Sequence, residues 1–200
     1  SPSTELTPIT PGQIGKAQEL IGAALRKSGL PSEPTQLVLE SQGGQLADEY
    51  VTSLRKRVEA ISDMIVRRVK VDRARSPQET LDTTGRKQYT DKDVVKTMPR
   101  GKGDEVDVCF FKLGHFVSDS DLEKEYSFRG LKAVDPYSLA QVNADDSAFA
   151  DDRPNGTHWQ DADGKWYFAA FGYWRGERDV VVDRNDLDWN GGWWVAGLRK

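Results

Sequence analysis

The sequence predicts an α+β protein with an N-terminal helical unit followed by a mixed domain around an aromatic-rich antiparallel sheet. Apolar residues recur at helical spacing up to about residue 62, and the pattern then changes to the alternation typical of strands. All six tryptophans lie between residues 159 and 194, in short apolar segments separated by turn residues. These observations indicate helices first and a hairpin-rich sheet last.

The helical unit is predicted to span residues 10–62, as a helical hairpin or a three-helix unit, after a disordered tether at 1–9. Thr10 and Pro11 suit a helix start, and Gly29 suits its end. A shorter helix is expected from Ser32 to Glu40, ended by the glycines at 43 and 44. One apolar stripe marks the longer helix that follows: Leu46, Tyr50, Leu54, Val58 and Ile61.

The mixed domain is predicted over residues 64–200. Strands are expected at 65–71 and 106–111, and short helices follow the capping residues Ser76 and Thr90. Further helices are expected at 119–129 and from Pro136 to about 143, with a short strand at 131–134 between them. The antiparallel strands of the C-terminal sheet are expected near 158–159, 165–171, 179–183 and 193–199.

Two of these last strands, 167–171 and 193–196, are apolar on both faces and must be covered twice or form a binding surface. The favoured interpretation covers one face with the domain's own helices and the other with the N-terminal helices. The alternative is an aromatic platform for a peptide, sugar ring or base, with Trp174, Trp189 and either Trp193 or Trp194 exposed. The candidate binding residues are Trp174, Arg175, Arg178, Trp189 and Trp193.

Charge is unevenly distributed: residues 51–102 hold 14 basic and 7 acidic residues, whereas the flanks are acidic. This basic middle favours either charge complementarity within the protein or an anionic partner. A nucleic-acid-associated protein using residues 55–102 is therefore one functional alternative. The possible anion contacts are Arg67, Arg68, Lys70, Arg73, Arg86 and Lys87.

Catalytic and metal-binding patterns are weak, so no catalytic residue, metal ligand or cofactor is predicted. Neither His115 nor His158 has a second ligand at metal-binding spacing, and Cys109 in mid-strand is expected to be a small buried residue. The segment from residue 186 to 191 resembles the start of a calcium loop, but its twelfth position is glycine, so a turn is expected. An enzyme of unknown class remains an alternative through carboxylates near the C-terminal hairpins: Asp161 with Glu177, or Asp179 with Asp183.

A single cysteine, no long apolar run and no signal pattern predict a cytoplasmic protein that does not enter a membrane. The favoured function is a non-enzymatic binding or protein-interaction module. A protein partner or a homo-oligomer is plausible, because helical units with one strong apolar stripe often self-associate.

Residues 75–97 (RSPQETLDTTGRKQYTDKDVVKT) and the C-terminal stretches FADDRPNGTHWQDADGKWYFAAF and WWVAGLRK are similar to a group of uncharacterised bacterial proteins from small or uncultured lineages. The resemblance covers roughly the last two thirds of the chain. It implies a bacterial source and a self-contained C-terminal domain, but no activity and no functional residue.

Overall fold

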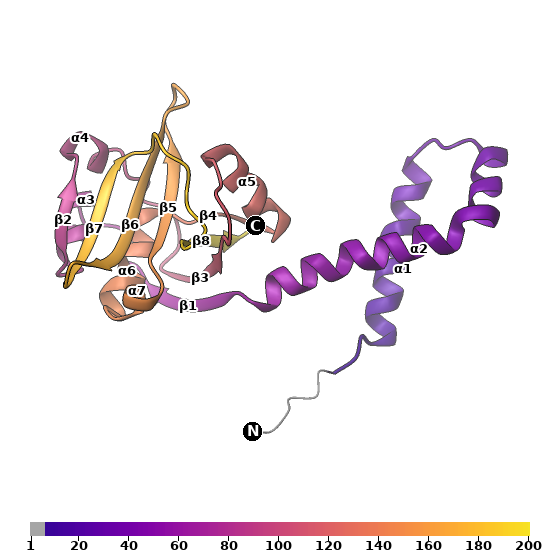
Figure 1. The fold of residues 1–200 in the computed structure, drawn as a ribbon, viewed down its shortest axis with the longest axis horizontal. Helices are drawn as coiled ribbons and strands as arrows, with labels where there is room; N and C mark the ends of the chain where they lie inside the picture. Colours follow the sequence, from indigo (N-terminus) through magenta and orange to yellow (C-terminus); the bar gives the residue numbers. More distant parts are fainter. Residues whose placement is uncertain (1–6) are drawn as a thin grey trace. The chain divides into compact units, whose positions relative to one another are not determined.

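The computed structural model describes residues 7–200, which form two compact units divided between Leu54 and Arg55. The predicted tether at 1–9 lies mostly outside the described residues, and residues 7–9 have no regular structure. The α+β class is confirmed, because helices precede a mixed sheet of eight strands (Figure 1).

The N-terminal helices are α1 (Pro11–Lys27) and α2 (Ser32–Ser62). Thr10 caps α1 as predicted, in a reciprocal capping box with Gln13. The expected break at Gly43 and Gly44 is wrong, because α2 runs through both. Each glycine costs a helix about 1 kcal/mol relative to alanine, which a helix of this length can absorb.

The sheet domain alternates short helices with eight strands. The strands are β1 (Ile65–Lys70), β2 (Lys87–Thr90), β3 (Glu105–Lys112), β4 (Leu131–Ala133), β5 (Asn155–Gln160), β6 (Trp166–Trp174), β7 (Glu177–Arg184) and β8 (Trp194–Arg199). The helices are α3 (Pro77–Asp82), α4 (Lys92–Val95), α5 (Asp119–Phe128), α6 (Pro136–Asp145) and α7 (Phe149–Asp152).

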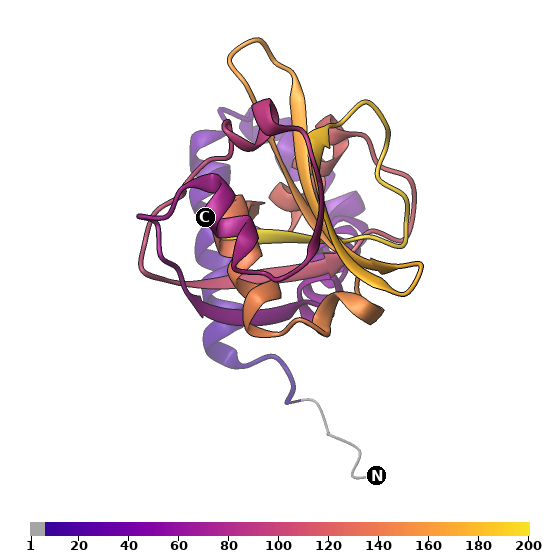
Figure 2. The ribbon, with the colours of Figure 1, turned by 90° about the vertical axis from the view of Figure 1, so that its left-hand side faces the viewer.

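The strand order is β1-β3-β8-β5-β6-β7-β2, with β4 paired to β8 as well. Most pairs are antiparallel as predicted, but β5 pairs β8 and β2 pairs β7 in parallel, so the sheet is mixed. Strand β2 was not predicted, because four polar-rich residues become a strand only through pairing with β7. In Figure 2 strands β5–β7 stand steeply against β1 and β3, so the sheet is strongly twisted.

Both faces of the sheet are covered, as its two-sided apolar strands require. Phe110 lies in the core on the face packed by α6 and α7, whereas its neighbour Phe111 lies in the core on the other face. Leu122 and Tyr126 of α5, together with Trp189, belong to this second core. The sheet domain thus supplies through α5 and the segment before β8 the cover that was predicted to come from the N-terminal helices.

Candidate functional site

The most distinctive polar cluster of the sheet domain is centred on His158 of β5, whose ring lies between two carboxylates of α5. Nδ1 is 2.6 Å from Asp119 Oδ1, and Nε2 is 2.7 Å from Glu123 Oε1. The imidazole is almost wholly buried, and Glu123 is half exposed at the edge of the cluster. We call these three residues the carboxylate clamp.

Local sequence explains how α5 presents its two carboxylates. Ser118 caps the helix through the amide of Asp121, which fixes Asp119 as the first helical residue. Asp119 and Glu123 are four residues apart and so lie one turn apart on the same face. Asp119 also gains from the positive end of the helix dipole.

A second layer of contacts holds the clamp in place. Asp119 also accepts hydrogen bonds from Asn185 Nδ2 at 2.8 Å and from Trp189 Nε1 at 3.0 Å. Trp166 stacks on the His158 ring with centroids 4.3 Å apart. Gly156 leaves room for the Trp189 ring, which a Cβ at that position would approach to 2.8 Å. The clamp is thus a rigid network connecting α5, β5, β6 and the segment before β8.

Sequence reasoning missed this cluster. The only available signal was the pair Asp119 and Glu123 at one-turn spacing behind a serine cap. Its partner His158 is 39 residues from Asp119, and β5 brings the two together only in the folded sheet.

Geometry determines the protonation of His158. Because both ring nitrogens face carboxylates, both donate, and the ring is an imidazolium. Burial alone would lower the pKa of His158, but the hydrogen bonds and charges of Asp119 and Glu123 outweigh burial and raise it above 6.5. The hydrogen bond from His158 lowers the pKa of Glu123 below 4.5, against the opposing effect of burial.

These shifts predict how stability depends on pH. The contribution of His158 is complete below its unfolded pKa of 6.5 and is lost as pH rises through its higher folded pKa. The contribution of Glu123 is complete above 4.5 and is lost as pH falls through its lower folded pKa. We therefore expect the clamp to stabilise the protein most between pH 4.5 and 6.5, measured as the urea midpoint at each pH.

His158→Gln is the diagnostic variant, since it should remove most of the decline in stability on the alkaline side of this window. His115→Gln serves as the control, because His115 is largely exposed and its nearest carboxylate oxygen is 3.7 Å away. A wild-type midpoint that stays constant across the neutral range would contradict the assigned charge of His158.

A cleft of about 920 Å³ adjoins the clamp. Glu123, Trp166 and His158 line it together with two lysines, Lys102 and Lys132. His158 has no free nitrogen to act as a base, and the lowered pKa of Glu123 makes it a poor proton donor near neutral pH. The cleft can therefore offer fixed hydrogen-bond acceptors, ammonium groups and an aromatic wall, which suit binding better than proton transfer.

Within residues 7–200, no group of three or more His, Cys, Asp or Glu side chains is arranged to hold a metal ion. In the same part of the chain, no helix combines the length and the apolar character needed to cross a membrane.

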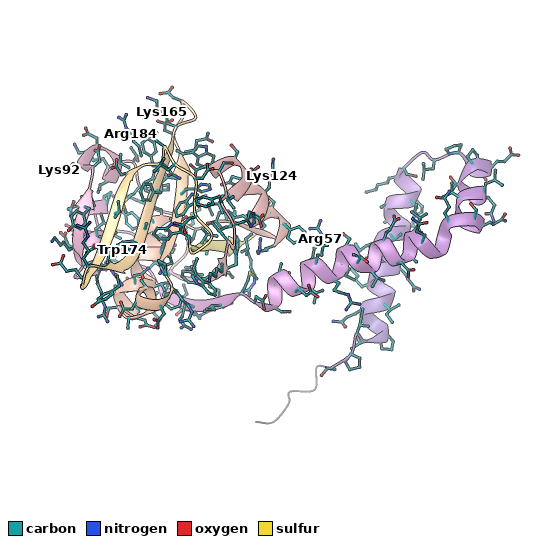
Figure 3. All side chains as sticks on the ribbon, viewed as in Figure 1. Arg57, Lys92, Lys124, Lys165, Trp174 and Arg184 are labelled. Atoms are coloured by element: carbon teal, nitrogen blue, oxygen red, sulfur yellow. The ribbon has the colours of Figure 1, made fainter. Side chains whose placement is uncertain are left out.

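The structure brings three of the predicted aromatic residues together. The ring of Trp193 meets Trp174 edge-on at 5.9 Å and Trp189 at 5.6 Å. Trp189 is buried and donates a hydrogen bond to Asp119. The prediction that an aromatic platform would expose Trp189 is therefore wrong. Figure 3 places Trp174 near one end of the sheet, with Lys165 and Arg184 at the other.

The two predicted arginines at this end of the sheet have structural roles. Arg175 has φ = 51° and, with Gly176, forms the two-residue turn between β6 and β7. The Arg178 guanidinium binds both carboxylate oxygens of Asp151 at 2.9 and 2.7 Å, which raises its pKa. Neither arginine shares a hydrogen bond with the tryptophan cluster in the described contacts.

The predicted anion contacts are mostly engaged within the sheet domain. Arg86 is buried and donates to the carbonyls of Gly172 and Ser147 at 3.0 and 2.7 Å. Arg73 binds Asp135 at 2.9 Å. The remaining four have partners nearer the surface: Arg67 over Phe149, Arg68 with Glu105 and Asp107, Lys70 with Glu105, and Lys87 with Glu177.

The expected carboxylate pairs do not form. Asp161 precedes β6 and Glu177 follows it, so the nine-residue strand separates them. Asp179 and Asp183 lie four residues apart on β7, roughly 13 Å by the rise of a strand. Cys109 is buried as predicted, and burial raises the pKa of its thiol, which makes it unreactive.

The helical unit carries the second candidate site. Helices α1 and α2 contain no buried residue. Twelve of their large apolar side chains are exposed, with exposed fractions from 38% at Ile21 to 66% at Leu37. The exposed members are Ile14, Leu20, Ile21, Leu25, Leu37, Val38, Leu39, Leu46, Tyr50, Val51, Val58 and Ile61.

No protein-family model, curated protein or solved structure matches this chain. The resemblance to uncharacterised bacterial proteins therefore stays a prediction. The described residues define a class of protein: an α+β sheet domain preceded by two helices that contain no buried residue.

Proposed function

We propose that this chain is a non-enzymatic interaction protein that binds another protein molecule through the apolar surface of α1 and α2. A bacterial source and a cytoplasmic location belong to the same proposal, supported by the sequence resemblance and the single cysteine. The observation that carries the proposal is the absence of any buried residue in helices of 17 and 31 residues.

The way in which protein helices gain stability supports the proposed interaction. Most of the stability of a protein helix comes from packing its apolar face, and not from intrinsic propensity. Large exposed apolar surface is typical of protein interaction sites. A dozen large apolar side chains on two helices thus support a partner that covers them.

The two alternatives have less support. A nucleic-acid site in residues 55–102 would need free cations, and Arg73 and Arg86 are held inside the sheet domain. An enzyme would need a reactive group, and His158 has both ring nitrogens engaged by carboxylates.

Site-specific photo-crosslinking tests the proposal. A benzoylphenylalanine at position 54, on the apolar stripe of α2, should give crosslinked protein adducts in cells that express the chain. The same residue at position 52, on the opposite side of the helix, is the matched control. Equal or no adducts from both positions would contradict binding through this surface.

A further inference from the structure

Helix α2 has an internal symmetry about Thr52 that bears on its partner. Consider two antiparallel copies of α2 related by a twofold axis at residue 52. Each residue of one copy then lies level with the residue of the other copy that is equally far from position 52 in the opposite direction along the sequence. This places Ile61 level with Gly43, Val58 with Leu46, and Leu54 with Tyr50.

The helical repeat places the innermost of these residues on one line. At 3.6 residues per turn, positions 43, 50, 54 and 61 fall within roughly 20° of a common line along the helix. That line runs along the side of the helix opposite the Thr52 side chain. The stretch from 43 to 61 has its midpoint at residue 52. A twofold axis can therefore pass through the middle of the apolar stripe and pair it with itself.

Size and charge favour the same pairing. Gly43 and Gly44 leave a gap in the stripe that can receive Ile61 of the other copy. Residues 42–49 carry two acidic and no basic residues, whereas residues 55–62 carry three basic and one acidic. Antiparallel copies set these segments beside each other, whereas parallel copies would set like charges together.

The sheet domain offers no comparable apolar surface. Between residues 65 and 200, the exposed large apolar residues are few and spread over β1, β2, two loops and the end of β6. They are Val66, Tyr89, Phe116, Tyr173, Trp174 and Leu187. The self-complementary spacing and charge of α2 therefore favour a second copy of α2 as the partner of the stripe.

We propose that the partner of α2 is a second copy of the chain, paired antiparallel about a twofold axis at Thr52. This inference rests on the proposed function and names the partner of the same surface. The resulting contact is isologous and closes as a dimer.

Sedimentation equilibrium on the full chain tests the mass. We expect twice 22.4 kDa in the micromolar range. Leu54→Glu should raise the dimer dissociation constant roughly 30-fold or more, as expected for a buried interface centre. Thr52→Glu introduces the same charge on the opposite side and should leave the constant unchanged; equal effects of the two variants would overturn the proposal.

Disulfide trapping tests whether the two copies of α2 pair antiparallel. Gly43→Cys and Ile61→Cys, mixed and oxidised, should give a mixed disulfide, while each alone should give little. In the antiparallel dimer, like positions would lie roughly 27 Å apart along the helix, too far for a disulfide. The native Cys109 is buried and does not interfere.

The outcomes separate the two proposals. Disulfides between like positions would overturn the antiparallel pairing. If the chain sediments as a monomer at every concentration, the proposal of a second copy as partner is overturned. Adducts to a different protein from position 54 would then still support the proposed function. A monomer without position-specific adducts would overturn both.

Discussion

Replacing Asp119 with alanine is expected to lower the free energy of unfolding of the sheet domain by about 3–5 kcal/mol, as for a buried ion pair that loses one partner. The imidazolium of His158 would remain buried beside only one carboxylate. The donors of Asn185 and Trp189 would lose their acceptor as well. Urea unfolding followed by tryptophan fluorescence measures the loss.

Asp121→Ala is the matched control, because Asp121 lies on the same helix in an exposed ion pair with Lys124. Such surface pairs contribute little to stability because solvent screens them. Similar losses for the two variants would show that the clamp does not stabilise the domain as its geometry implies.

The second large effect is expected at Gly191. A Cβ there would lie 2.6 Å from two backbone atoms, the Gly114 carbonyl carbon and the His115 nitrogen. Backbone held by the pairing of Val117 with Trp189 cannot easily move away. Gly191→Ala should therefore cost about 3 kcal/mol, at the upper end for overpacking.

Its neighbour provides the comparison. At Gly192 a Cβ would meet the side-chain oxygen of Asn190 at 3.2 Å, and that side chain can move away at the loss of only its exposed hydrogen bond from the Gly192 amide. Gly192→Ala should cost well under half as much, measured by the same urea unfolding. The close approach of the two loops would be disproved by equal losses at both positions.

Much of the chain's local structure follows from neighbouring residues. The caps at Thr10 and Ser76 were predicted because a side-chain oxygen satisfies amides two or three residues away. The predicted cap at Thr90 is wrong by one residue, because Asp91 caps α4. The stripe of α2 was predicted because its spacing matches one helical turn. The glycines at 43 and 44 were wrongly predicted to end a helix, because the free energy that two glycines cost is small relative to the stability of a long helix.

The candidate site was harder to predict from the sequence than the local structure. Arg86 was expected to meet an anion because it lies in a basic stretch, yet it is buried against three carbonyls of distant segments. His158 gave no local signal, because its two carboxylates come from a helix more than 30 residues away.

The sequence by itself determined the starts of α1 and α3, the two-faced apolar strands and the α+β class, since each depends on contacts within a few residues. Only the tertiary structure decided the strand order, the parallel pairs, which segment covers the second face of the sheet, and the partners of His158. Those features depend on which distant segments meet, and that choice is set by the packing of the whole domain and not by any local pattern.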